Sequence, residues 1–290
     1  MAEIRIENLT VENGLTFRTR QAGPLDGEPV LLLHGFPTTS AIWEGVLSAL
    51  GDRGYRAVAP DQRGYSPSAR PVGFKSYRYT DIATDVVRCA DALNFDRFHL
   101  VGHDFGAIAG WASLGLLGAR VRSWSALAVP HVRAFGTAIR EDPDQRAMSG
   151  YVHRLRSQTG VDELVEEWSR DDFRELRADW SVNTPEPMYA DFASVLTQPG
   201  ALEAAYNWYL GTDGISPTDD ELDFADVSVP TLCMWGNADP FVSRSSCEAA
   251  AKMMTGPYRF IELKAGHWLQ IDAPDRVTSE ILTHVQEWRI

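Results

Sequence analysis

The chain has 290 residues, of which 44% are hydrophobic and 23% charged, and its formal net charge is −13. Such a composition is typical of a globular protein with enough residues for one large α/β domain and an inserted subdomain. The acidic balance excludes nucleic acid as the expected partner, because a phosphate backbone requires clustered Lys and Arg.

The N-terminal half of the chain alternates strand and helix patterns. Residues 4–6 and 15–19 alternate as strands do, with Asn13-Gly14 as a hairpin turn between them. The apolar run 29–33 predicts a central parallel strand buried on both faces. A helix from about 42 to 50 and a strand over 56–59 follow. A helix over 81–93 and strands over 98–101 and 124–129 complete this half.

The character of the chain changes between residues 131 and 223, which are rich in charge, aromatic side chains and helical spacing. The βα alternation then resumes, with strands over 230–235 and 258–263 and helices over 245–254 and 274–288. We therefore predict an α/β fold, a mainly parallel sheet with helices on both faces. Its core comprises residues 1–130 and 224–290, and residues 131–223 form a helical cap over the carboxyl edge of the sheet, where ligands bind.

The cysteine content and the N-terminus bear on location. Cys89, Cys233 and Cys247 are too few for a disulfide framework and indicate a reducing compartment. Residues 1–5 do not show the pattern of a signal peptide, and no apolar run approaches the ~20 residues of a membrane span. We therefore expect a cytoplasmic protein with no membrane partner.

Asp104 is the residue most informative about chemistry. It follows a predicted strand, lies between Gly102 and Gly106, and precedes an apolar helix. This is the setting of a nucleophile elbow, which usually presents a serine. A carboxylate of pKa ~3.9 is ionised at pH 7 and can attack saturated carbon, giving an ester that water must cleave. Epoxides and alkyl halides fit such an attack. The alternative role for Asp104 is a helix N-cap.

Five segments carry a resemblance to a known family. They are His34-Gly35-Phe36-Pro37, residues 61–66, residues 102–106, residues 235–239 and Gly266-His267-Trp268. Over essentially its whole length the chain resembles the α/β-hydrolase superfamily, and within it the epoxide hydrolases, relatives of the haloalkane dehalogenases. Motif order and the position of each motif at a predicted strand end make the resemblance specific.

The resemblance implies a catalytic triad in the chain order of this fold. Asp104 would be the nucleophile, His267 the general base and Asp239 the acid that orients the imidazole. The competing interpretations are an inconsequential loop histidine and a turn-forming aspartate before Pro240. An oxyanion hole would be formed by the backbone N–H groups of Phe36 and Phe105.

Further expectations concern the pocket. The resemblance implies a cis peptide bond before Pro37, and we expect Pro37, Trp208, His153 and Trp268 to line the substrate pocket. Opening an epoxide generates an alkoxide, and a tyrosine of pKa ~10 can donate a proton to it. Asn207-Trp208-Tyr209 resembles the epoxide-hydrolase motif that supplies this tyrosine.

A second oxygen donor is less sharply placed by the resemblance. Tyr151 falls near the family's other cap tyrosine, with His153 as a possible substitute. Packing is the alternative role for either tyrosine. The pattern of haloalkane dehalogenases has Asn in the first loop and Trp directly after the nucleophile. This chain departs from that pattern, because it has Phe36 and Phe105 at these two positions. Leu210 also departs from the arginine that often follows the epoxide-hydrolase tyrosine.

The predicted function is therefore that of an epoxide hydrolase, which opens an epoxide to a vicinal diol through an ester on Asp104 that is hydrolysed by water activated by His267 and Asp239. The expected substrate is an apolar small molecule. No metal or organic cofactor is implied, because the candidate ligands show no ligand spacing. A haloalkane or haloacid dehalogenase and an ester hydrolase are the alternatives. A non-catalytic ligand-binding protein on the same scaffold is a more remote one. The sequence identifies neither the substrate nor the oligomeric state.

Overall fold

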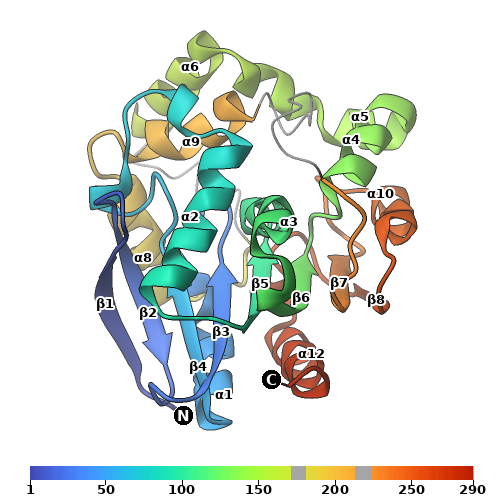
Figure 1. Cartoon of the computed structure of the whole chain (residues 1–290). Coiled ribbons are helices and arrows are strands. Elements are labelled where there is room, and N and C mark those ends of the chain that lie inside the picture. Colours follow the sequence, from blue (N-terminus) through green and yellow to red (C-terminus); the bar gives the residue numbers. More distant parts are fainter. Residues whose placement is uncertain (171–180, 213–223, 290) are drawn as a thin grey trace.

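An eight-stranded sheet forms the centre of the computed structural model, which describes residues 1–170, 181–212 and 224–289 (Figure 1). The strand order is β1-β2-β4-β3-β5-β6-β7-β8. The strands are β1 (Ile4–Thr10), β2 (Thr16–Ala22), β3 (Glu28–Leu33), β4 (Tyr55–Pro60), β5 (Phe98–His103), β6 (Val121–Leu127), β7 (Thr231–Gly236) and β8 (Tyr258–Leu263). From β4 to β8 all neighbours are parallel, whereas β2 pairs antiparallel with both β1 and β4. The predicted fold class is confirmed.

The central strands are apolar because helices cover both of their faces. Val30, Leu31, Leu32 and Leu33 on β3 are at most 1% exposed, as expected for a strand buried on two sides. Helices α2 (Tyr79–Ala92) and α3 (Phe105–Leu117) lie on one face. Helices α1 (Glu44–Asp52) and α12 (Pro274–Glu287) lie on the other (Figure 1).

Two predicted helices differ at their ends. The first begins at Glu44 rather than 42, because Ser40–Trp43 form a 3-10 turn in which the Thr39 side chain accepts the Ala41 N–H. The helix predicted over 245–254 is divided into α10 (Arg244–Ala249) and a 3-10 segment, Ala250–Met253. Neither difference changes the order of the elements.

A helical insertion separates β6 from β7. It contains α4 (Val132–Glu141), α5 (Pro143–Met148), a 3-10 segment (Gly150–Arg156), α6 (Gln158–Arg170), α8 (Glu186–Leu196) and α9 (Ala201–Gly211). Within the described part of the insertion no residue belongs to a strand. Helices α6 and α9 lie over the carboxyl ends of the parallel strands (Figure 1). Residue 223, the predicted end of the insertion, is outside the described residues.

An ionic cluster seats the insertion on the core. Asp191 on α8 accepts hydrogen bonds from Arg18 (3.1 Å), Arg20 and the Thr39 hydroxyl. Arg18 also pairs with Asp61, which is fully buried. This partly buried cluster links α8 to β2 and to the residues that follow β3, and loss of Asp191 would leave Arg18 and Arg20 with fewer carboxylate partners.

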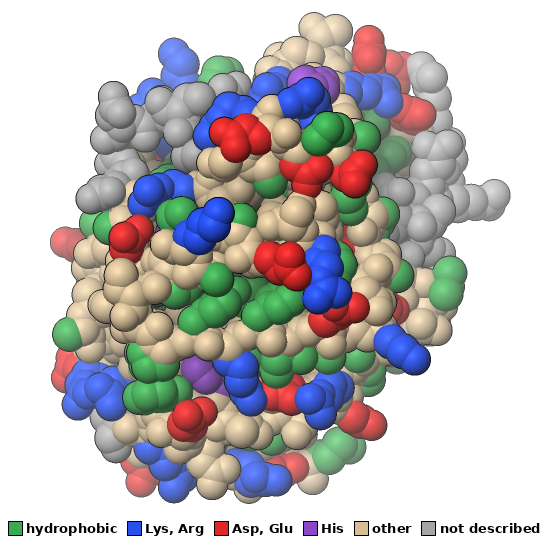
Figure 2. Space-filling view, turned by 90° about the vertical axis from the view of Figure 1, so that its right-hand side faces the viewer, with side chains coloured by type: hydrophobic (Ala, Val, Ile, Leu, Met, Phe, Trp, Pro, Cys, Tyr) green, Lys and Arg blue, Asp and Glu red, His purple; other side chains and the backbone are tan. Residues whose placement is uncertain are grey.

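The surface around α10 and β8 carries charges of both signs. Figure 2 shows Lys and Arg side chains next to Asp and Glu side chains over the described part of this face. Arg244, for example, pairs with Glu248 at 2.8 Å and also with Glu262. Such interspersed charges do not make the basic patch that a nucleic-acid-binding face requires. Among the described helices, none combines the length and the apolar character needed to cross a membrane.

Candidate active site

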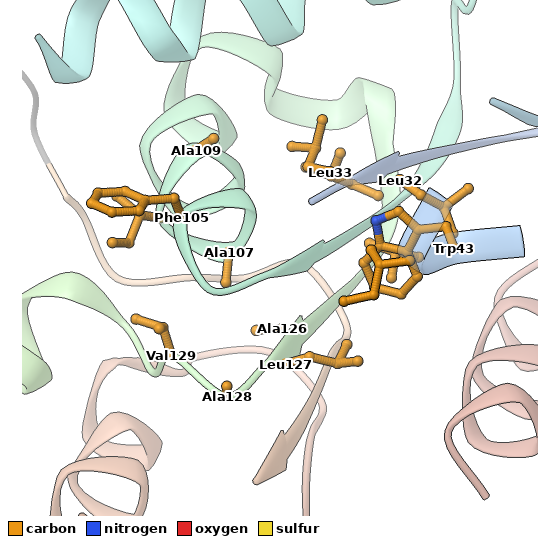
Figure 3. Close-up of a cluster of buried hydrophobic side chains, with 14 of the residues drawn as sticks. Leu32, Leu33, Trp43, Phe105, Ala107, Ala109, Ala126, Leu127, Ala128 and Val129 are labelled. Atoms are coloured by element: carbon orange, nitrogen blue, oxygen red, sulfur yellow. The ribbon is translucent and has the colours of Figure 1, made fainter. Parts of the chain in front are cut away.

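Asp104 occupies the sharp turn between β5 and α3. Its backbone has φ 53° and ψ −122°, a conformation that costs a non-glycine residue about 1–3 kcal/mol and is found mostly at functional sites. A Cβ on Gly106 would come within 2.1 Å of the Leu33 carbonyl oxygen, and one on Gly102 within 2.3 Å of the Gly106 oxygen. The glycines therefore let the strand and helix approach closely enough to form the turn. Figure 3 shows Phe105, Ala107 and Ala109, at the start of this helix, among the buried hydrophobic side chains.

The Asp104 carboxylate is held by two backbone N–H groups. Its Oδ1 accepts the Phe36 N–H at 2.7 Å, and the Phe105 N–H also donates to the carboxylate. These are the two donors predicted for the oxyanion hole. Gly35 is required beside them, because a Cβ there would lie 2.3 Å from Oδ1. The second oxygen, Oδ2, is 3.3 Å from Nε2 of His267.

The imidazole of His267 lies between two carboxylates. Its Nδ1–H donates to Asp239 Oδ2 at 2.8 Å, and Oδ1 of Asp239 accepts the N–H groups of Phe241 (2.8 Å) and Val242 (3.1 Å). Burial alone would lower the pKa of His267, but the charges of Asp239 and Asp104 and their hydrogen bonds raise it to about 10. Burial likewise opposes ionisation of Asp104, yet His267 holds the pKa of that carboxyl below its usual value.

His103 is a buried part of the site that sequence reasoning missed. Its Nε2–H donates to the backbone oxygen of His267 at 2.9 Å, so the residue before the nucleophile holds the loop that carries the base. Burial, followed by the positive charge of His267, lowers the pKa of His103 to about 4. A neutral imidazole with its proton on Nε2 is therefore the form that makes this contact. The signal in the sequence was a polar residue ending an otherwise apolar strand.

A cavity of about 280 Å³ lies between Asp104 and the helical insertion. Its wall is largely aromatic and aliphatic, with the nucleophile and base at one end. The lining residues are Phe36, Pro37, Asp104, Tyr151, Arg154, Leu155, Leu164, Trp168, Tyr206, Tyr209, Phe241, His267 and Trp268. The cis peptide bond expected before Pro37 is present.

Tyr209 and Tyr151 face the nucleophile across this cavity and hydrogen-bond to each other. The Tyr209 ring contacts those of Phe105 and Phe36, with centroid distances of 4.7 and 5.5 Å. Burial, reinforced by the negative charge of Asp104, raises the pKa of Tyr151. Burial, the Tyr151 hydroxyl and Asp104 do the same for the pKa of Tyr209. Both hydroxyls are therefore protonated at neutral pH and available as donors.

Two predicted pocket residues are placed elsewhere. Trp208 is 1% exposed and packs beneath Phe105, with its Nε1–H donating to the Arg63 carbonyl oxygen at 2.8 Å. Successive residues of an α-helix point about 100° apart, so Trp208 faces the core while Tyr209 faces the cavity. His153 is exposed and does not line the cavity, whereas Tyr151, although 40% exposed, does, because residues two apart in a 3-10 helix point in different directions. His153 therefore does not substitute for Tyr151.

Other lining residues had no sequence signal strong enough to place them. Phe241 packs edge-on against His267 at 5.1 Å and against Tyr151 at 5.3 Å between ring centroids. Trp168 on α6 and Tyr206 on α9 form the far wall, 5.5 Å apart. Their roles depend on how the insertion docks on the core, which no local pattern reports. Within the described residues no group of His, Cys, Asp and Glu is arranged to hold a metal ion.

Comparison with known proteins places the chain in a family. A sequence model of the alpha/beta hydrolase fold matches residues 28–274. The chain belongs to the α/β-hydrolase family. This α/β hydrolase is 30% identical to Epoxide hydrolase A of Mycobacterium tuberculosis over 312 aligned positions, covering 95% of this chain and 96% of the relative.

Solved structures show the same fold in proteins with different names. A Bacillus megaterium epoxide hydrolase in complex with an inhibitor superimposes with a TM-score of 0.83 at 23% identity, covering 97% of this chain and 100% of the other. A putative acyltransferase from Salmonella enterica superimposes at 0.86 with 21% identity, covering 99% of this chain and 96% of the other. The fold of this α/β hydrolase therefore does not by itself determine its reaction, which depends on the side chains of the site.

Proposed function

We propose that this α/β hydrolase opens epoxides to vicinal diols through a covalent ester on Asp104. The observation that carries the proposal is an ionised carboxylate and a pair of protonated tyrosines that line one largely aromatic and aliphatic cavity. A carboxylate suits attack on saturated carbon, and phenols suit protonation of the departing oxygen. The similarity to a protein named an epoxide hydrolase supports the proposed function.

In the first step, one oxygen of Asp104 attacks an epoxide carbon and the ring carbon–oxygen bond breaks. Oδ1 accepts the Phe36 N–H at 2.7 Å, whereas Oδ2 has only the longer 3.3 Å contact with His267 Nε2, so Oδ2 is the oxygen that forms the new bond. The electron pair of the broken bond moves to the ring oxygen, which takes a proton from the hydrogen-bonded hydroxyls of Tyr209 and Tyr151. Proton donation by a positioned side chain contributes about 10²–10⁴-fold.

In the second step, His267 becomes a base because the ester no longer carries the charge of Asp104. With one of its two carboxylates neutralised, the pKa of His267 falls, and the proton that it gives up replaces, through solvent, the one that the tyrosines gave to the ring oxygen. The neutral ring then takes a proton from water as that water attacks the ester carbonyl. The negative charge that develops on Oδ1 remains beside the N–H groups of Phe36 and Phe105, a contact worth about 3 kcal/mol per donor in the barrier. The bond between the carboxyl carbon and the substrate oxygen breaks, and the departing oxygen takes the proton of the new carboxyl group. The diol leaves, and the Asp104 carboxylate again faces a protonated His267.

The origin of oxygen tests the covalent step. In a single turnover of styrene oxide with excess protein in ¹⁸O-water, we expect the label in the Asp104 peptide and not in the diol. Label in the diol alone would mean direct attack by water. Asp104→Asn should show no turnover once deamidation is excluded, and His267→Gln should accumulate the ester, because it keeps the nucleophile but lacks the base.

The same preparation distinguishes the alternatives on this scaffold. A haloalkane or haloacid dehalogenase would release halide from 1-chlorobutane or chloroacetate, and an ester hydrolase would cleave p-nitrophenyl acetate. A non-catalytic binder would bind styrene oxide without consuming it. The proposal requires the epoxide to be turned over faster than any of these probes.

The division of the chain and its location belong to the same proposal. We infer a hydrolase core of residues 1–130 and 224–290 and a cap of residues 131–223, supported by the helical insertion between β6 and β7. A cytoplasmic location is supported by three cysteines that are all free and buried, as a reducing compartment permits. The expected partner is a small apolar molecule, which the aromatic cavity wall supports.

A further inference from the structure

A carboxylate outside the triad anchors the loop that carries His267. Asp272 ends the short helix α11 (Leu269–Asp272), and its Oδ2 accepts the N–H of Gly266 at 2.8 Å. Gly266 directly precedes His267, and a Cβ at Gly266 would already lie 3.0 Å from that oxygen. With His103 holding the backbone oxygen of His267, the base loop is fixed at two successive residues.

The other oxygen of the same carboxylate binds the helical insertion. The Ser181 hydroxyl donates to Oδ1 of Asp272, and Nδ2 of Asn183 lies 3.4 Å from the same oxygen. Ser181 is itself set in a turn, because its carbonyl oxygen accepts both the N–H (2.9 Å) and the hydroxyl (2.7 Å) of Thr184. This turn leads directly into α8, the helix whose Asp191 is clamped to the core.

We propose that Asp272 is a positioning residue that couples the seating of the helical insertion to the placement of His267. The inference rests on the proposed function, in which His267 acts on the ester. Asp272 does not line the cavity, so it acts through Gly266 and not on substrate. One planar carboxylate joins both contacts, and a displacement of the Ser181 turn is transmitted to the base loop through two hydrogen bonds.

The two catalytic steps should respond differently to this residue. His267 removes a proton only during ester hydrolysis, whereas ester formation depends on Asp104 and the tyrosines. A misplacement of about 1 Å can slow a reaction by about 10²-fold. Loss of Asp272 should therefore slow the decay of the ester and leave its formation nearly unchanged.

Four variants separate the contacts. Asp272→Ala removes both, and Ser181→Ala removes only the contact to the insertion. Asp272→Asn keeps both in altered form, since its amide oxygen can accept from Gly266 while its amide nitrogen donates to the Ser181 hydroxyl. Asp275→Asn is the matched control, because it removes an exposed carboxylate three residues away at the start of α12.

The first measurement is stopped-flow tryptophan fluorescence during turnover of styrene oxide, since Trp168 and Trp268 line the cavity. We expect Asp272→Ala to slow ester decay by at least about tenfold and Asp272→Asn to recover most of that loss. Ser181→Ala should slow decay less, and the double variant Ser181→Ala/Asp272→Ala should match Asp272→Ala. Equal slowing of both steps, an equal effect of Asp275→Asn, or additive effects in the double variant would overturn the coupling.

The second measurement does not depend on activity. Hydrogen exchange resolved to the Gly266 amide should be slow in the wild type and faster in folded Asp272→Ala, because its acceptor is gone. Unchanged exchange at Gly266 in that variant would refute the anchoring role. If the wild type did not consume epoxide while this exchange result held, the proposed function alone would be at fault.

Discussion

Replacing Asp104 with Asn should lower the pKa of His267, and the size of the fall follows from the site. The rise of that pKa from 6.5 to about 10 corresponds to about 5 kcal/mol, at about 1.36 kcal/mol for a tenfold change. Two carboxylates share this effect, Asp239 at 2.8 Å and Asp104 at 3.3 Å. We assign somewhat less than half of it, about 2 kcal/mol, to the more distant Asp104. In Asp104→Asn the pKa of His267 should therefore lie between about 8 and 9.

The assay is an NMR titration of protein labelled with ¹³C at the histidine ring carbons, from about pH 5.5 to 11. The chain has seven histidines, and a His267→Gln spectrum identifies the signal of interest. Asp275→Asn serves as the control, because its carboxylate is exposed and outside the site. A pKa of His267 that is unchanged in Asp104→Asn would refute the reasoning, since loss of the charge on Asp104 is also what we propose converts His267 into a base.

The same titration has a consequence for stability. Because the pKa of His267 is raised on folding, its stabilising contribution is complete below about pH 6.5 and is lost as the pH rises toward about 10. Urea unfolding over this interval should show a steeper loss of unfolding free energy for the wild type than for Asp104→Asn. Equal slopes for the two proteins would contradict the raised pKa.

Gly35→Ala should reduce kcat by at least about 10²-fold, because the added Cβ would displace the Asp104 carboxylate, and its circular dichroism spectrum should be retained. Gly45→Ala is the control and should keep full activity, because a Cβ there would have nothing within 4 Å. Tyr209→Phe should slow ester formation by about 10²-fold in stopped-flow traces and leave ester decay unaffected; slowing of decay instead would assign the tyrosine to the wrong step. Asp191→Ala should lower the free energy of unfolding in urea by about 2 kcal/mol. The effect is less than that of leaving a buried charge with no partner, because Arg18 and Arg20 each keep another carboxylate. An unfolding free energy equal to that of the wild type would show that α8 is held by other contacts.

The sheet was predictable because its signals are local. The apolar run of β3 and the alternation of β1 and β2 each follow from the period of a strand. Asp104 was conspicuous for a similar reason, since only a strand, two close glycines and an apolar helix produce its turn. Parallel strands bring their carboxyl ends to one edge of the sheet, so the residues that follow neighbouring strands could be expected to lie together.

The cavity was harder to predict because it depends on docking between distant segments. Trp208 and Tyr209 are adjacent in the sequence, yet only the seating of α9 decides that the first is buried and the second faces the nucleophile. On the 3-10 segment, Tyr151 lines the cavity whereas His153 is exposed and does not. Asp272 was equally invisible, since its partners, Gly266 and Ser181, come from the core and the insertion.

The point at which the insertion leaves and rejoins the sheet determines how freely it can vary. The chain departs after β6 and returns at β7, and these two strands are hydrogen-bonded neighbours. Residues beyond β6 remain tied to β7 by the bond from the Ala128 N–H to the Met234 carbonyl oxygen at 2.9 Å. Lengthening, shortening or exchanging the helices between these strands therefore leaves the pairing of the core intact. Substrate range can therefore diverge through the insertion, provided that its Tyr151 and Tyr209 and the contact from Ser181 to Asp272 are retained.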